Sequence, residues 1–123
     1  MGPIPKPSDD DKAYFASLFE HRPDVELKPM FGNLAAFSVN NAQMCAGLFG
    51  PLVGIRLDEA QREELLAVKG AGPFGPEDRP MKEYVSLPPS WRTGHDDEVD
   101  AWIDTAVAHT ATLPAKKKKA KKA

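Results

Sequence analysis

The chain has 123 residues, of which 41% are hydrophobic and 28% charged, so it is long enough for one folded domain and too short for two. This composition excludes a wholly disordered protein. The single cysteine, Cys45, excludes an intramolecular disulfide, and with the three histidines it forms no metal-ligand spacing, so we expect neither a metal nor a cofactor. The sequence contains no signal peptide and no apolar run of membrane-spanning length, which predicts a cytoplasmic protein.

The net charge of -2 hides a strong asymmetry between the body of the chain and its end. Six of the 16 basic residues fall in the last eight positions, which leaves the body with a net charge of -8 and the end with +6. A block of like charge cannot pack into a core, so we expect residues 114–123 to be a disordered tail. Lysine neutralises phosphates without reading bases, so any nucleic-acid contact by this tail is predicted to be non-specific; a solubilising role is the alternative. The predicted contact residues are Lys116, Lys117, Lys118, Lys119, Lys121 and Lys122.

The N-terminal residues 1–8 contain three prolines and are expected to be an extended lead-in. Ser8 and the three aspartates after it are typical of a helix start, because they cap the free N–H groups and favour the helix dipole. Aromatic and aliphatic residues then recur at helical spacing, which predicts a helix over 9–21 that ends before Pro23.

Residues 34–57 are predicted to form a three-stranded antiparallel meander. Asn40-Asn41 and Gly50-Pro51 suit two-residue turns, and pairing the strands around them places Phe37 opposite Met44. One face is then wholly apolar and should be the core; Cys45 lies on the other face, as a structural thiol without a neighbouring cation to activate it. The expected core residues are Ala35, Phe37, Met44, Ala46, Leu48, Val53, Ile55 and Leu57.

The rest of the chain alternates helix and strand. Asp58 with Gln61 predicts a capped helix that Gly70 closes, and residues 81–87 predict a strand, with a second short strand around Phe74. A last helix starts at the acidic cluster Asp96–Glu98 and buries a stripe that includes Trp102. The predicted domain, residues 9–113, is therefore an α+β fold of two layers, with helices on an antiparallel sheet in the order helix, three strands, helix, one or two strands, helix.

Three groups of residues are candidates for a site. Met30, Phe31 and Gly32 could line a groove before an edge strand and are the tentative partner-binding residues, with core packing as the alternative. The acidic residues from Asp96 to Asp104 are interpreted as a solvated helix face, because consecutive helical side chains point in different directions. His109 has no serine or cysteine at triad spacing, so no catalytic residue is assigned.

Several short motifs, taken in order, resemble one known family. They are Met30-Phe31-Gly32-Asn33, Met44-Cys45-Ala46-Gly47-Leu48-Phe49, Arg79-Pro80-Met81-Lys82-Glu83-Tyr84-Val85-Ser86-Leu87-Pro88, and a closing helix with Trp102. This pattern resembles the N-terminal domain of the TfoX/Sxy competence regulators over residues 9–113. The resemblance implies the order helix, three strands, helix, two strands, helix, and a co-regulator of transcription that acts through other proteins. The chain departs from the family at Asn33, where a second glycine is usual, and in having a lysine tail in place of a helical C-terminal domain.

These observations favour a non-enzymatic regulatory or interaction module that acts through protein partners, with the tail adding non-specific affinity for nucleic acid. A direct, sequence-independent DNA- or RNA-binding protein is the first alternative, although the acidic body does not provide the basic face of such a protein. An enzyme acting on a small molecule is the second, and no nucleophile, base and orienting group can be named for it.

Overall fold

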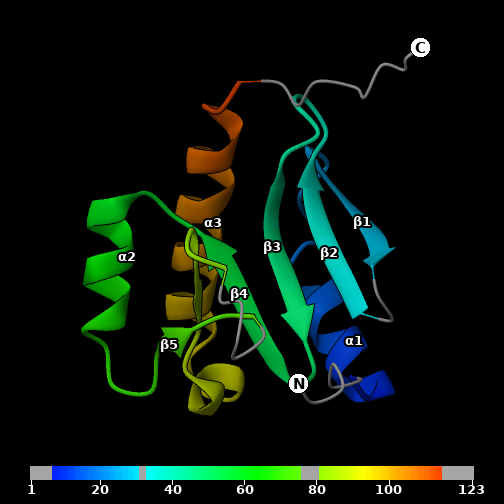
Figure 1. The fold of residues 1–123 in the computed structure, drawn as a ribbon. Coiled ribbons are helices and arrows are strands. Elements are labelled where there is room, and N and C mark those ends of the chain that lie inside the picture. The colour runs from blue at the N-terminus through cyan, green and yellow to red at the C-terminus, as the bar shows by residue number, and fades with distance from the viewer. Residues whose placement is uncertain (1–6, 31–32, 76–80, 115–123) are drawn as a thin grey trace.

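The computed structural model describes residues 7–30, 33–75 and 81–114, which form an antiparallel sheet with helices on one side. The sheet has six strands in the order β1-β2-β3-β4-β6-β5. In Figure 1, α1 and α3 lie behind the sheet and α2 lies beside its β4 end, so within the described residues one sheet face carries no helix. The elements are α1 (Asp9–Ser17), β1 (Val25–Met30), β2 (Asn33–Ser38), β3 (Met44–Phe49), β4 (Leu52–Arg56), α2 (Glu59–Leu66), β5 (Gly72–Pro73), β6 (Tyr84–Ser86), the 3-10 helix η1 (Pro89–Arg92) and α3 (Asp96–Ala111).

This architecture confirms the predicted α+β class, and it adds one strand to the sheet. β1 pairs with β2 ahead of the predicted meander. The sequence did not indicate β1 because Pro29 lies inside it, and proline cannot donate a hydrogen bond to a strand ladder. The sheet tolerates Pro29 because β1 is an edge strand.

The predicted starts of the first two helices are confirmed. Ser8 and Asp11 form a reciprocal capping box: the Asp11 N–H donates to Ser8 Oγ at 3.0 Å, and the Ser8 N–H donates to Asp11 Oδ2 at 2.9 Å. Asp58 and Gln61 do the same at the start of α2. The first helix is shorter than predicted: α1 ends at Ser17, and the next residues turn through i to i-3 hydrogen bonds from Leu18 and Phe19.

The second hairpin has the predicted register, whereas the first differs from it because of a β-bulge. Leu48 pairs with Val53, and Phe37 pairs with Met44, both as expected. Cys45 is the extra residue, however, so that Ala36 rather than Ala35 pairs with Ala46. Because side chains alternate along a strand, this shift exchanges the two faces of β2. The prediction that Phe37 and Met44 belong to the core is therefore wrong, because both are only partly buried, whereas Ala35 is fully buried as predicted although it lies outside the main core cluster.

The buried core contains residues from all three helices. Phe15 and Phe19 come from α1 and the turn after it, Leu65 from α2 and Ile103 from α3, and they pack on the core side of β2, β3, β4 and β6. Cys45 is also a core residue, contrary to the prediction, and its thiol donates to the Ala36 carbonyl at 3.5 Å. Burial raises the pKa of Cys45 to about 12, so the expected structural role of this thiol is consistent with its surroundings.

The turn between β2 and β3 is longer than predicted and fixes the end of α3. Ala42, not Asn40 or Asn41, has the positive φ, at 61°. The buried Asn41 amide donates to the carbonyls of Thr110 at 2.8 Å and Leu113 at 3.0 Å, and its Oδ1 accepts from the Gln43 N–H at 3.1 Å. Asn41 thereby adds a side-chain donor to two carbonyls at the helix C-terminus, where backbone donors are few; the Thr110 carbonyl also accepts from the Leu113 N–H at 3.1 Å.

Replacing Asn41 with alanine is therefore expected to lower the free energy of unfolding by about 1–3 kcal/mol, because the hydrogen bonds of the buried Asn41 amide to the Thr110 and Leu113 carbonyls are lost. The matched control is Asn40→Ala, since Asn40 is the exposed neighbour in the same turn. We expect that change to stay within about 0.5 kcal/mol. Urea unfolding of the two variants measures the difference, and equal values would show that the Asn41 side chain contributes nothing specific.

Candidate interaction surface

The sheet face without helices forms the first candidate site. Strand alternation opposite the core places on it exposed or partly exposed residues of five strands, β1, β2, β3, β4 and β6, together with the buried Phe74. We call this surface the open face; its members are Lys28, Phe37, Met44, Phe49, Leu52, Arg56, Phe74 and Tyr84. It combines aromatic rings and a methionine with two cationic side chains, one on the edge strand β1 and one on β4.

Phe74 fits into the open face because two strand residues lack side chains. A Cβ atom on Gly54 would lie 2.2 Å from Phe74 Cγ, and one on Gly47 would lie 3.5 Å from its ring. The Phe74 ring contacts Phe49 edge-on at 6.1 Å and Tyr84 at 6.1 Å between centroids. The glycines therefore form a slot in the sheet that this ring fills.

The two cations of the open face differ in their surroundings. Lys28 is exposed, and its Nζ lies 5.5 Å from the centre of the Phe37 ring. Arg56 is largely buried: it pairs with Glu83 at 2.6 Å and donates to the Met44 carbonyl at 3.2 Å. The Tyr84 hydroxyl donates to the same carbonyl at 3.1 Å. Arg56 and Tyr84 thus stabilise the surface through their hydrogen bonds to β3, whereas the charge of Lys28 faces solvent.

Most of the residues predicted as sites fall outside the described part of the chain. Met30 ends β1, while Phe31 and Gly32 lie between the described ranges. The lysines of residues 115–123 also lie outside them. Asn33, where the family usually has glycine, is buried, and its Oδ1 accepts from the Gly50 N–H at 3.1 Å, which links the turn before β2 to the turn after β3.

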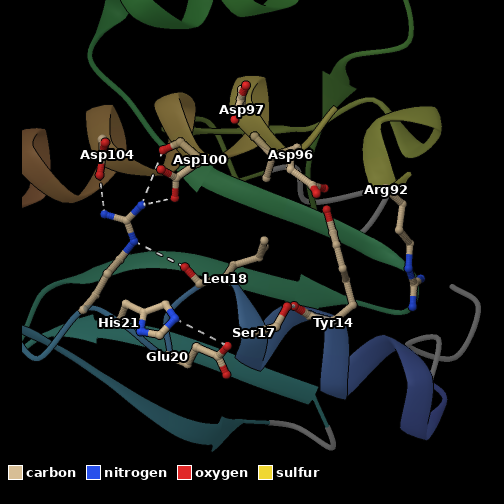
Figure 2. A pocket seen from close by; sticks show the side chains of 12 residues that line it. Tyr14, Ser17, Leu18, Glu20, His21, Arg92, Asp96, Asp97, Asp100 and Asp104 are labelled. Atoms are coloured by element: carbon tan, nitrogen blue, oxygen red, sulfur yellow. Dashed lines mark hydrogen bonds and ion pairs between the residues drawn. The ribbon is translucent and has the colours of Figure 1, made fainter. Parts of the chain in front are cut away.

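A second candidate is a polar groove of about 730 Å³ between α1 and α3 (Figure 2). Arg22 crosses it to pair with Asp100 at 2.7 Å and with Asp104, and its Nε donates to the Leu18 carbonyl at 3.3 Å. Figure 2 shows the Tyr14 side chain extending towards Asp96 at the other end. The groove therefore contains internal ion pairs that connect α3 with the segment after α1.

The acidic residues of α3 are exposed, as expected of a solvated helix face, but four of them converge on this groove, contrary to the expectation that their side chains diverge. Asp96, Asp97, Asp100 and Asp104 line the same groove, because residues three and four apart share one side of a helix. Two of the four are paired with Arg22, which was not expected from the sequence. Such long-range pairing has no local sequence signal.

Beside the groove, Asp11 pairs with Arg92 at 2.5 Å, and the Arg92 guanidinium lies over the Tyr14 ring at 4.8 Å. The hydrogen bond from Arg92 and the backbone hydrogen bond from Ser8 lower the pKa of Asp11. A lowered native pKa stabilises the fold above the ordinary pKa of aspartate, and that contribution is lost as the pH falls through the lower native value.

We therefore expect Asp11→Asn to be less stable than the wild type at pH 7 and to approach it as the pH falls below the ordinary pKa of aspartate and through the lowered native pKa of Asp11. Urea unfolding at several pH values measures this convergence. Asp10→Asn is the control for the helix dipole, because Asp10 is exposed in the same first turn. A stability gap for Asp11→Asn that stayed constant down to pH 2 would contradict the ion-pair explanation.

Within the described ranges, no group of three or more histidine, cysteine, aspartate or glutamate residues could hold a metal ion. None of the helices in residues 7–30, 33–75 and 81–114 combines the length and apolar character needed to cross a bilayer. His109 is partly buried near the C-terminal end of α3.

The fold and the open face define a small α+β domain whose sheet is covered by helices on one side only. The family model of the TfoX N-terminal domain matches residues 17–110, which is most of the chain. The chain therefore belongs to the TfoX N-terminal domain family, as its motifs indicated, and this membership indicates a regulatory type of module. No match was found among curated proteins or among solved structures.

Proposed function

We propose that this domain is a non-enzymatic regulatory module that acts through a protein partner bound to the open face. The observation that carries the proposal is the partly exposed set of Phe37, Met44, Phe49 and Tyr84 on the side of the sheet opposite the core. Aromatic residues and methionine are enriched at the centres of protein interfaces, where they contribute most of the binding energy.

The chemistry of the open face defines the partner it would fit. The aromatic and methionine side chains favour an apolar segment, and Lys28 supplies an exposed positive charge at the margin. A partner segment with apolar side chains and one carboxylate would match both features. Any role of the domain in transcription or competence would then depend on which protein this partner is.

Affinity capture with the full chain tests the proposal. Nuclease-treated cell extract is passed over four immobilised proteins: the wild type, Phe37→Asp, Lys28→Glu and the control Leu66→Asp. The control changes an exposed apolar residue of α2 instead of the open face. We expect a captured protein whose affinity falls at least about tenfold in the first two variants and is unchanged in the control. Thermal unfolding confirms that each variant is folded before it is compared.

Two results would contradict the proposal. One is a partner that binds all four proteins equally, and the other is a partner lost only from the α2 variant. Either result would place the interaction elsewhere on the molecule. Using Lys28→Glu beside Phe37→Asp keeps the test valid if one of the substitutions disturbs the fold.

We also propose that the lysine tail adds weak, sequence-independent affinity for nucleic acid. The charge of +6 against a body of -8 supports this division of roles. We expect duplex DNA to bind with a dissociation constant on the order of 10⁻⁴ to 10⁻⁶ M and a slope of log K against log salt no steeper than about -5. A chain lacking residues 115–123 should lose this binding; retained binding, or preference for one sequence, would favour the direct nucleic-acid-binding alternative.

A further inference from the structure

The outer edge of β1 is a backbone surface that the domain itself leaves unpaired. Within the described residues β1 pairs only with β2, and Figure 1 shows β1 at the margin of the sheet. An edge strand of this kind offers its N–H and C=O groups to another strand. The ladder between β1 and β2 determines which of these groups are free.

The hydrogen bonds of this ladder fix the direction of each backbone group in β1. Just before the first pair of the ladder, the Val39 N–H donates to the Asp24 carbonyl at 2.9 Å. Hydrogen-bonded and non-hydrogen-bonded pairs alternate along an antiparallel ladder. The backbone groups of Val25, Leu27 and Pro29 therefore point away from β2.

Of these three outward-facing residues, Leu27 alone can exchange two hydrogen bonds with a further strand. Pro29 has no N–H and offers only its carbonyl. The Val25 N–H already donates to the Arg22 carbonyl at 3.0 Å. Leu27 keeps both a donor and an acceptor, so a regular antiparallel pairing at this edge has to be centred on it.

The residues on either side of Leu27 carry opposite charges. Glu26 and Lys28 are both exposed, and strand alternation places them on the same face of the sheet. An antiparallel strand of the same sequence, centred on Leu27, would place its lysine opposite Glu26 and its glutamate opposite Lys28. These two would be non-hydrogen-bonded pairs, in which opposed side chains lie closest together.

We propose that two copies of this chain associate through β1, about a two-fold axis at Leu27. The two Leu27 residues exchange a pair of backbone hydrogen bonds, and Glu26 of each copy pairs with Lys28 of the other. A two-fold interface needs a self-complementary surface. The backbone groups and the charges of β1 meet this need at the same register. The occupant of this edge is a second copy, so the contact goes beyond the partner proposed for the open face.

The composition of β1 also predicts that the association is weak. Lysine and proline on an edge strand normally discourage pairing. Here Pro29 excludes a pairing centred on itself, because neither copy would have a donor, and Lys28 disfavours any register that opposes the two lysines. One register remains, with two hydrogen bonds at its centre. An interface of this small size dissociates on dilution.

Sedimentation equilibrium of the full, purified chain tests the dimer. At concentrations up to about 1 mM, we expect an equilibrium between monomer and dimer. Glu26→Lys and Lys28→Glu should each weaken association at least about tenfold, because each opposes like charges in both pairs. An equimolar mixture of these two variants should restore association, since every lysine then opposes a glutamate.

Glu63→Lys is the matched control, because it makes the same change of charge at an exposed residue of α2. It should associate as the wild type does, and its mixture with Lys28→Glu should not restore association. A chain that stays monomeric at about 1 mM would overturn the proposal. A mixture of Glu26→Lys and Lys28→Glu that associates no better than either variant alone would also overturn it.

Hydrogen exchange at the Leu27 amide locates the contact. This N–H faces solvent in the monomer and is bonded in the dimer, so its exchange should slow at least about twofold between about 0.05 and 1 mM. The amides of Glu26 and Lys28 point to β2 in both states and should change less. Exchange at Leu27 that is independent of concentration in a dimeric chain would place the interface elsewhere and refute the proposal. The purified chain contains no other protein, so these results do not depend on the partner of the open face.

Discussion

Replacing Gly54 with alanine is expected to destabilise the domain by about 3 kcal/mol, at the upper end of the usual cost of overpacking. The Cβ atom would lie 2.2 Å from Phe74 Cγ and 2.3 Å from Cδ1, so the ring would have to leave its slot. Phe74 is only 3% exposed, and its removal from the slot would also separate it from Phe49 and Tyr84. Urea unfolding measures the loss.

Alanine at two other glycines of the sheet is expected to cause smaller losses of stability. At Gly47 the nearest atom to an added Cβ is the terminal methyl of Met44 at 2.8 Å, which can move, and at Gly72 it is Ser86 Oγ at 4.0 Å. We expect costs in the order Gly54→Ala, Gly47→Ala, Gly72→Ala, with the last below about 1 kcal/mol. In a Phe74→Ala background Gly54→Ala should cost almost nothing; additive costs in this double-mutant cycle would refute the slot.

Phe15→Ala should lower the free energy of unfolding by about 3–5 kcal/mol, because the ring is fully buried and its removal leaves a cavity in the core. Phe15 packs with Phe19 at 5.2 Å between centroids, within the core that the helices share. Phe37→Ala should cost only about 1 kcal/mol, since Phe37 is half-buried on the open face.

The comparison of these two phenylalanines tests the bulge at Cys45. The bulge turns Phe37 away from the core, whereas a regular hairpin would bury it. Equal losses in urea unfolding for Phe15→Ala and Phe37→Ala would show that β2 presents its other face to the helices. A small loss for Phe37→Ala would also show that this position can be changed in binding experiments without unfolding the domain.

Features set by nearby residues were predictable from the sequence. The capping residues of α1 and α2, the glycine turn at Gly50 and the boundaries of α3 depend on contacts within a few positions. The bulge at Cys45 was not predictable, because one extra residue in a strand leaves no local signal and yet exchanges the faces of the strand before it. The edge strand β1 was not predicted, and Pro29 within it is a residue that strand patterns normally exclude.

The open face was only partly visible in the sequence. Gly47 and Gly54 lie inside predicted strands, and glycine at such positions signals that another group approaches the backbone closely. This signal could have indicated the slot for Phe74, but the residue that fills it is 20 positions further on and no pattern identifies it. The pairs Asp11–Arg92 and Arg22–Asp100 likewise join residues about 80 positions apart, so only the folded chain shows them.

The most direct measurement of the central claim is site-specific photocrosslinking in living cells. A photoreactive amino acid replaces Lys28 on the open face or, as the control, Leu66 on α2; both positions are exposed. Partner binding at the open face predicts a protein adduct from position 28 that is absent from position 66, resists nuclease and persists in a chain without residues 115–123. Adducts of equal yield at both positions, or adducts to nucleic acid alone, would contradict it.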